Sequence, residues 1–142
     1  MKRIALLVLP LILASAMPAA ATTWKTALSK HSECQGSVPT NWVPAFAGIG
    51  MKAPAGTSQI LISYKKATIL QVKLAVPGMF KITKTFEDTP TRYWIEYAAA
   101  PGAHHWYVLT PNGNALCSAV FDFDNTLSDA DAKTMATSVK QH

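Results

Sequence analysis

The clearest pattern of hydrophobic and polar positions lies near the end of the chain, in residues 104–123. Two runs rich in β-branched and aromatic residues flank Asn112-Gly113. This dipeptide is typical of a two-residue hairpin turn, because both central positions of such a turn need positive φ. The pattern predicts a β-hairpin with Cys117 opposite Val108. One face of it is apolar and is expected to be core, and it carries Trp106, Val108, Cys117, Ala119, Phe121 and Phe123.

Alternation with a period of two also runs through much of the chain before this hairpin. Short polar or proline-containing segments, such as Pro77-Gly78, separate the alternating runs and are expected to be turns. Alternation of this kind is typical of strands with one buried face. Together with the hairpin it predicts an antiparallel meander of about six strands, the first four at residues 60–64, 70–76, 80–86 and 93–97.

Helical spacing occurs on both sides of the predicted sheet. Trp24, Leu28 and His31 are four and three residues apart, which predicts a short helix within residues 22–35. Ser128 is a favourable N-cap and starts a second predicted helix that runs nearly to the end of the chain. The apolar stripe of this second helix, which we expect to pack on the sheet, is Ala132, Met135, Ala136 and Val139.

The predicted fold class is therefore α+β. It consists of an N-terminal helix, an antiparallel meander of about six strands, and a C-terminal helix packed on one sheet face, with one disulfide. This order of elements resembles the Mog1/PsbP-like shape. The resemblance is one of element order, no sequence motif carries it, and we assign no family.

Residues 38–56 form a long connection that is rich in proline and glycine. Loops of this length in a compact domain are either functional or packed by their own apolar side chains. Trp42, Phe46 and Met51 are the large apolar residues of this segment. Both interpretations therefore stay open, with Trp42 either closing an edge of the core or meeting a ligand.

The first 21 residues have the composition of a secretory signal peptide. Lys2 and Arg3 make a basic start, ten apolar residues follow, and Ala19-Ala20-Ala21 fits the small-residue cleavage pattern. We therefore divide the chain into a signal peptide at 1–21 and a single exported α+β domain at 22–142. Cleavage leaves eleven basic and eight acidic residues, so the net charge falls from +5 to +3, which does not indicate a nucleic-acid partner.

Cys34 and Cys117 are the two cysteines of the chain. An exported protein enters an oxidising compartment, where an isolated pair of cysteines usually forms a disulfide. We predict a Cys34–Cys117 bond that joins the N-terminal helix to the hairpin. The predicted location of the protein is the periplasm or the outside of the cell.

Closely spaced acidic residues follow the second strand of the hairpin. Residues 120–127 read Val-Phe-Asp-Phe-Asp-Asn-Thr-Leu. This segment resembles the first motif of the haloacid dehalogenase phosphatases, which implies Asp122 as nucleophile and Asp124 as general acid/base, with Mg²⁺ between them. The other motifs of that family come later in the chain, and only 15 residues follow Leu127 here. An Asp-based phosphatase is therefore kept as a remote alternative, and we expect Asp124 to begin a turn instead.

Two other patterns contain residue types that bind metals, but the spacing of these residues does not fit a metal site. A calcium loop starting at Asp122 would need glycine at its sixth position and glutamate at its twelfth, where the chain has Leu127 and Lys133. His104 and His105 are neighbours on a strand and point to opposite faces, so they do not share a metal ion. We therefore predict no metal site, no cofactor and no catalytic residues, and enzyme activity is not expected.

The face of the sheet opposite Cys117 remains as a candidate binding surface. It would be aromatic and aliphatic with basic neighbours, and exposed patches of that kind usually bind partners. The alternative is that residues 38–56 fold over it. The predicted binding residues are Arg92, Trp94, His105, Tyr107 and Leu109 on this face and Trp42 in the loop.

The sequence thus predicts a small exported, non-enzymatic protein that binds another macromolecule. An inhibitor or immunity-type partner of a toxin or cell-wall enzyme fits its size and its disulfide. A periplasmic small-molecule or lipid-binding protein is the alternative. We expect the partner to be another periplasmic or extracellular protein, with no nucleic acid and no transmembrane segment after signal cleavage.

Overall fold

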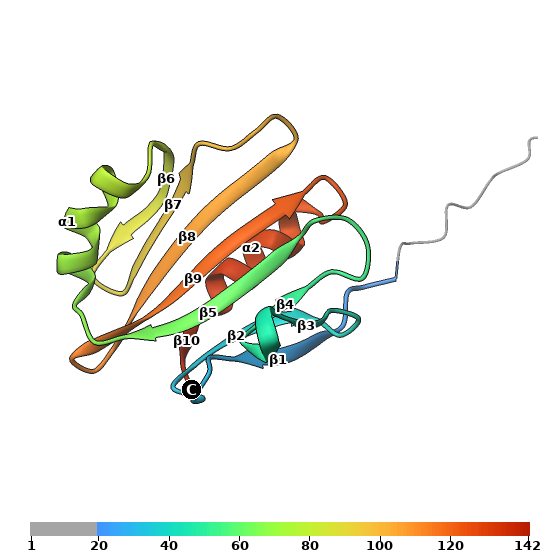
Figure 1. The fold of residues 1–142 in the computed structure, drawn as a ribbon, viewed down its shortest axis with the longest axis horizontal. Coiled ribbons are helices and arrows are strands. Elements are labelled where there is room, and N and C mark those ends of the chain that lie inside the picture. The colour runs from blue at the N-terminus through green and yellow to red at the C-terminus, as the bar shows by residue number, and fades with distance from the viewer. Residues whose placement is uncertain (1–19) are drawn as a thin grey trace, which may run out of the picture.

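The computed structural model describes residues 20–142, which form two antiparallel sheets and two α-helices (Figure 1). The larger sheet has seven strands in the order β3-β4-β5-β9-β8-β7-β6, and the smaller sheet has three in the order β1-β2-β10. The predicted signal peptide lies almost wholly in residues 1–19, outside the described residues. The elements are β1 (Trp24–Leu28), β2 (Cys34–Pro39), β3 (Val43–Ala45), η1 (Phe46–Gly48), β4 (Gly50–Lys52), β5 (Gln59–Lys65), α1 (Ile69–Met79), β6 (Ile82–Thr89), β7 (Arg92–Tyr97), β8 (Ala103–Asn112), β9 (Ala115–Asp124), α2 (Asp129–Ser138) and β10 (Lys140–Gln141).

The predicted fold class is wrong in its layout: the described chain is mostly β and forms two antiparallel sheets, where one meander of about six strands between two helices was expected. The predicted N-terminal helix is absent, because this part of the chain is the β1–β2 hairpin. The helical stripe would have placed Leu28 and His31 on a buried face, but both are exposed. Ser29 closes the hairpin: its backbone N–H donates to the carbonyl of Cys34 at 2.9 Å, and its hydroxyl accepts the N–H of Cys34 at 3.0 Å. The hairpin persists because β2 also pairs with β10, so tertiary pairing overrides a weak local helical pattern.

The predicted strand at 70–76 is also wrong, because α1 occupies it. A capping box begins the helix: the Thr68 hydroxyl accepts the N–H of Gln71 at 3.2 Å, and the Gln71 side chain accepts the N–H of Thr68 at 2.9 Å. Pro77-Gly78 lie in the last turn of α1 and are not the predicted turn. The apolar residues of this segment fit a helical spacing as well as an alternating one. In the helix, Ile69, Val72 and Val76 face the large sheet.

The C-terminal hairpin is confirmed, with a register two residues away from the predicted one. Val108 lies opposite Ala119 and Thr110 opposite Cys117. The turn is therefore centred on Gly113-Asn114, with a φ of 58° at the glycine, as expected for glycine at the first central position of a type II′ turn. A shift by two keeps the alternation of faces. The predicted apolar face is accordingly buried in one cluster, made of Trp106, Val108, Cys117, Ala119, Phe121 and Phe123.

The predicted C-terminal helix is confirmed as α2, which lies behind β9 and β5 in Figure 1. The Ser128 hydroxyl accepts the N–H of Asp131 at 3.1 Å, as an N-cap does. The helix ends at Ser138, and the chain continues as β10 because those residues pair with β2. The predicted stripe is buried against the core, with Ala132, Met135, Ala136 and Val139 all shielded from solvent.

The predicted Cys34–Cys117 disulfide is present, with an S–S distance of 2.02 Å and both residues fully buried. It joins β2 of the small sheet to β9 near the centre of the large sheet. The bond therefore links two sheets instead of a helix and a hairpin. The described residues contain no helix that is both long enough and apolar enough to span a bilayer.

The large sheet buries apolar residues on both faces. The small sheet and α2 cover the face that carries Cys117, which we call the inner face. On the outer face, α1 and Phe80 cover the region of β7 and β8. Phe80 stacks on Tyr97 with ring centroids 4.4 Å apart and approaches Tyr107 at 5.7 Å. The rest of the outer face, over β5 and the end of β9, is only partly covered.

Candidate functional site

The structure separates the residues predicted to form one binding surface. Trp94 lies on the inner face, where its ring stacks on Phe86 at 4.4 Å and meets Trp106 at 5.0 Å. Tyr107 and Leu109 do lie on the outer face, but α1 covers them. All three are buried. The prediction that Trp94 shares a face with Tyr107 is therefore wrong, and these side chains do not form an exposed patch.

Arg92 and His105 are both half-buried and engaged in local contacts. The Arg92 guanidinium pairs with Glu87 at 3.1 Å and donates to the carbonyl of Thr137 at 3.0 Å. His105 pairs through Nδ1 with Asp122 on the outer face. Arg92 therefore ties β7 to the end of α2, and His105 joins neighbouring strands.

The two adjacent histidines diverge as predicted. His104 lies on the inner face, stacked on Phe123 at 4.7 Å, with Nδ1 3.1 Å from Glu96. Tyr97 stacks on His105 at 5.2 Å on the opposite face. Burial, with smaller effects from Asp122 and Tyr107, raises the pKa of Tyr97 to about 12, so its phenol stays protonated. Within residues 20–142 there is no group of three histidine, cysteine or acidic side chains arranged to hold a metal ion.

Asp124 is saturated by hydrogen bonds from two loops. Its Oδ2 accepts the N–H of Thr57 at 2.7 Å and its Oδ1 accepts the N–H of Thr126 at 2.9 Å. The hydroxyl and backbone donors of Thr126 and Thr57 hold the pKa of Asp124 far below its usual range. Both carboxylate oxygens accept hydrogen bonds from these donors, so a proton on either oxygen would have to displace one of them, which disfavours Asp124 as a general acid. Asp124 therefore ends β9 and fixes the loop before β5.

We expect Asp124→Asn to lower the melting temperature at pH 7, because the asparagine amide has one acceptor oxygen and its NH₂ group would face a donor. The folded pKa of Asp124 lies below the unfolded value of about 4, so its stabilisation is present above pH 4 and is lost as the pH falls further. Melting curves at pH 7 and pH 3 should show the gap between variant and wild type narrowing at pH 3. A gap that widens in acid would contradict this role. Asp122→Asn should have the smaller effect at pH 7.

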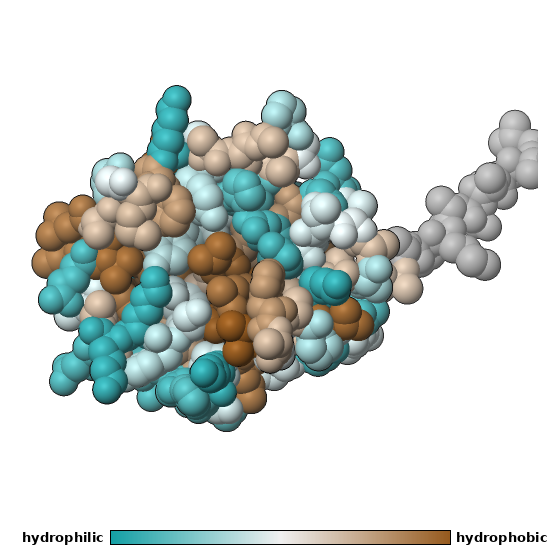
Figure 2. Space-filling view, viewed as in Figure 1, coloured by the Kyte–Doolittle hydropathy of each residue, from teal (hydrophilic) through white to brown (hydrophobic). Residues whose placement is uncertain are grey.

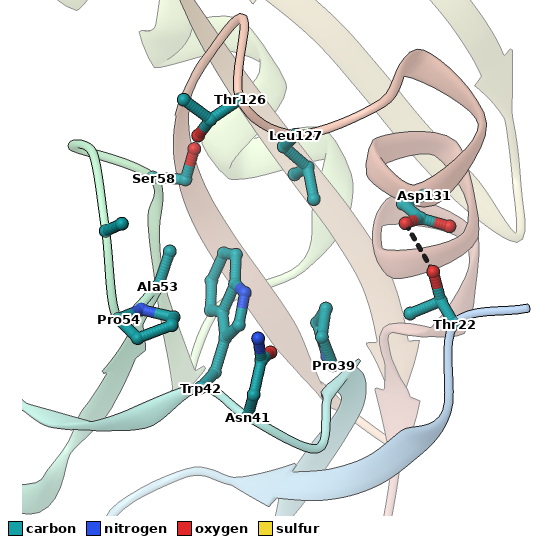
Figure 3. Close-up of a pocket in the computed structure, with 11 residues that line it drawn as sticks. Thr22, Pro39, Asn41, Trp42, Ala53, Pro54, Ser58, Thr126, Leu127 and Asp131 are labelled. Carbon is teal, nitrogen blue, oxygen red and sulfur yellow. Dashed lines mark hydrogen bonds between the residues drawn. The ribbon is translucent and has the colours of Figure 1, made fainter. Parts of the chain in front are cut away.

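A recess surrounds Trp42, between the end of β2, the loop before β5 and the start of α2 (Figure 3). Its volume is about 290 Å³. Trp42 stands between Pro54 and Asn41, and across from it Asp131 accepts a hydrogen bond from the Thr22 hydroxyl at 2.7 Å. Trp42 itself is buried and belongs to the inner core. The recess lies at the lower limit of ligand pockets, which start at about 300 Å³, so we assign Trp42 to packing.

Phe46, Ala47 and Gly48 form a strained turn that the sequence did not reveal. Their φ angles are 51°, 54° and 87°, so two residues with a Cβ adopt the left-handed region, which costs roughly 1–2 kcal/mol per residue. Phe46 is 47% exposed. It lies against Gly50, where an added Cβ would come within 2.6 Å of the ring. We call residues 46–48 the Phe46 turn.

An apolar groove lies beside the Phe46 turn, between β1 and β4. Figure 1 shows the short helical turn η1 next to these strands. The groove has a volume of about 420 Å³, within the usual range for ligand and side-chain pockets. Thr26, Ser29 and Lys30 supply polar groups to it. Its apolar lining is Ala27, Leu28, Ile49, Met51, Ile60 and Ile62.

The large exposed apolar side chains fall into two groups. One comprises Leu28, Val43 and Phe46, around the groove and the start of the Phe46 turn. The other lies on α1, and we call it the α1 ridge: Leu70, Leu74 and Met79, with exposed fractions of 63%, 74% and 59%. The long loop predicted at residues 38–56 is wrong, because this range contains β3, η1 and β4. The exposure of its side chains and its φ angles depend on the fold and could not be predicted from the sequence.

Comparisons with known proteins give a fold and no family. No protein-family description and no curated sequence matches the chain. The solution structure of cyanobacterial PsbP (CyanoP) from Synechocystis sp. PCC 6803 is similar, with a TM-score of 0.54 and 11% sequence identity over 92% of this chain and 99% of that chain. Identity at this level shows a shared fold alone. The likeness agrees with the resemblance in element order, although the N-terminal helix counted in that order is a hairpin.

Proposed function

We propose that this chain is a non-enzymatic exported protein that binds another protein, and that the Phe46 turn and the apolar groove form the contact. The observation that carries the proposal is the conformation of Phe46. An aromatic ring is displayed to solvent on a turn with two strained non-glycine residues. Backbone strain of this kind is retained mainly at functional sites, and exposed aromatic residues are frequent anchors of protein interfaces.

The groove gives such a partner a place to bury its own side chain. Its floor includes Ile60 and Ile62, which belong to the inner core, so an inserted aliphatic group would contact packed apolar atoms. Leu28 stands at its edge with 39% of its surface exposed. An anchor beside a pocket is the usual arrangement at the centre of an interface.

The export part of the proposal rests on the first 21 residues and on the disulfide. The basic start, apolar run and Ala19-Ala20-Ala21 fit a secretory signal. Disulfides such as Cys34–Cys117 persist in oxidising compartments and are rare in the cytosol. A periplasmic or secreted inhibitor or immunity-type protein agrees with both features.

The contacts of the two aspartates in the phosphatase-like motif also support a binding protein over a phosphatase. Asp122 pairs with His105 and accepts from Gln59 at 3.2 Å, and Asp124 is occupied by Thr57 and Thr126. Neither carboxylate is therefore free to act as nucleophile or general acid without breaking these contacts.

A small apolar ligand is the second candidate, and the groove itself favours it. A volume of about 420 Å³ that reaches the core could hold an aliphatic molecule in place of a partner's side chain. Native mass spectrometry of the exported protein separates the two, because a carrier should retain a ligand of fixed mass.

The protein-binding proposal predicts a specific loss on replacing Phe46. Phe46→Ser should weaken capture of a partner from periplasmic extract by about 30-fold, the effect of losing an anchor worth about 2 kcal/mol. Leu74→Ser is the matched control, since it also replaces an exposed apolar residue but on α1. Both variants should melt near the wild-type temperature. Undiminished capture by Phe46→Ser would contradict the proposal.

A further inference from the structure

The helix α1 is apolar on two sides, and the fold uses only one of them. Ile69, Val72 and Val76 pack on the outer face of the large sheet. Leu70 and Leu74 are one helical turn apart on the other side and are among the most exposed apolar residues of the chain. A surface helix normally carries polar residues on its outward side. The α1 ridge therefore indicates a second apolar surface that is unburied in the free protein.

The chain segment that carries the α1 ridge has charges of a single sign, although Asp88 of β6 lies beside the helix. Residues 65–86 contain no aspartate or glutamate. Lys66 precedes the helix and Lys81 follows it, both are exposed, and neither forms an ion pair with any described residue. Lys73 is neutralised by Asp88 on β6. The lysines of this acid-free segment are Lys65, Lys66, Lys73, Lys81 and Lys84.

We infer that α1 docks on an anionic lipid surface, with Leu70 and Leu74 of the α1 ridge inserted and Lys66 and Lys81 paired with headgroups. A helix whose exposed side is apolar can lie in the membrane plane with that side buried by about 5–10 Å, and lysines beside it attract anionic headgroups. Figure 2 shows the arrangement, with hydrophobic surface at the left end over α1 and hydrophilic side chains projecting beside it. Lys66 and Lys81 flank the helix at its two ends, which suits an anionic surface.

This surface is separate from the Phe46 turn, so the inference does not depend on the proposed function. The two sites are carried by different elements, α1 on one side of β5 and η1 with β4 on the other. A protein could use both, holding a partner through the groove while α1 keeps it at a membrane. Each can also fail without the other.

Vesicle binding of the purified exported protein tests the inference. Vesicles of phosphatidylglycerol and phosphatidylcholine in equal parts should co-sediment the protein, and vesicles of phosphatidylcholine alone should not. Raising the salt concentration should release it, since screening weakens contacts between lysines and headgroups. Leu70→Gln with Leu74→Gln should weaken binding by at least about tenfold, and Lys66→Gln with Lys81→Gln should weaken it on anionic vesicles.

Val43→Gln is the matched control, because it changes an exposed aliphatic residue on β3, at the opposite edge of the large sheet from β6 and outside the lining of the groove, and should leave vesicle binding unchanged. Each replaced residue is exposed, and melting curves should coincide with wild type. No binding to anionic vesicles, or equal binding by the Leu70→Gln, Leu74→Gln variant, would overturn the inference. A protein partner held by the α1 ridge in place of vesicles would overturn it as well.

Discussion

Trp106→Ala is expected to lower the free energy of unfolding by about 3–5 kcal/mol, the usual cost of truncating a buried aromatic residue. The indole is fully buried on the inner face and contacts Phe121 and Phe123, with ring centroids 5.8 Å and 4.5 Å away. Its Nε1–H donates to Glu96 at 2.9 Å. Truncation would leave a large cavity and remove one of the two contacts at Glu96 Oε2, the other being that with His104 Nδ1. Urea denaturation of the two proteins measures the difference.

Two further substitutions serve as comparisons for Trp106→Ala, one in the same aromatic cluster and one on the surface. Trp94→Ala should also destabilise the fold strongly, because Trp94 is 7% exposed and stacks on Phe86. Leu74→Ala should change stability by less than about 0.5 kcal/mol, since surface substitutions seldom do more. A Trp94→Ala variant as stable as wild type would mean that this aromatic cluster is not the core described here.

Cys117→Ser is expected to cost about 2–5 kcal/mol, the usual effect of removing a native disulfide. The bond spans a sequence separation of 83 residues and joins the small sheet to the large one. In the chain-entropy account, a cross-link over so long a loop restricts the unfolded chain strongly. Thermal and urea unfolding of the oxidised protein and the variant should give this difference.

Cys34→Ser provides the control for the disulfide. It breaks the same bond, so the double variant should be little less stable than either single one. Two titratable thiols in the unreduced exported protein, after unfolding, would contradict the bond.

Much of the sheet could be predicted because alternation is a local property of the sequence. In β8 and β9 it assigned both faces correctly even though the turn was one residue out of place, since the resulting shift in register was even. In β7, however, the alternating pattern did not show which of its two sets of side chains lies on the inner face. There Trp94 lies opposite Val108, on the inner face, because a one-residue difference in pairing reverses every side chain of a strand.

The two misassigned elements show where local pattern is insufficient. Residues 24–28 and 69–79 are short and have apolar spacings compatible with either a helix or a strand. Pairing with β2, which pairs with β10 on its other side, decided the first, and the Thr68–Gln71 capping box decided the second. The candidate site was even harder to predict from the sequence than these two elements. The exposure of Phe46 depends on positive φ angles at alanine and phenylalanine, which no residue preference indicates.

Photo-crosslinking from position 46 tests the central claim most directly. A benzophenone analogue of phenylalanine in place of Phe46 would sit on the exposed turn, and the same analogue in place of exposed Thr134 on α2 is the control. In cells that export the protein, irradiation should give one discrete heavier adduct from position 46 and none from position 134. No adduct from position 46, or equal yields from both positions, would contradict binding through the Phe46 turn.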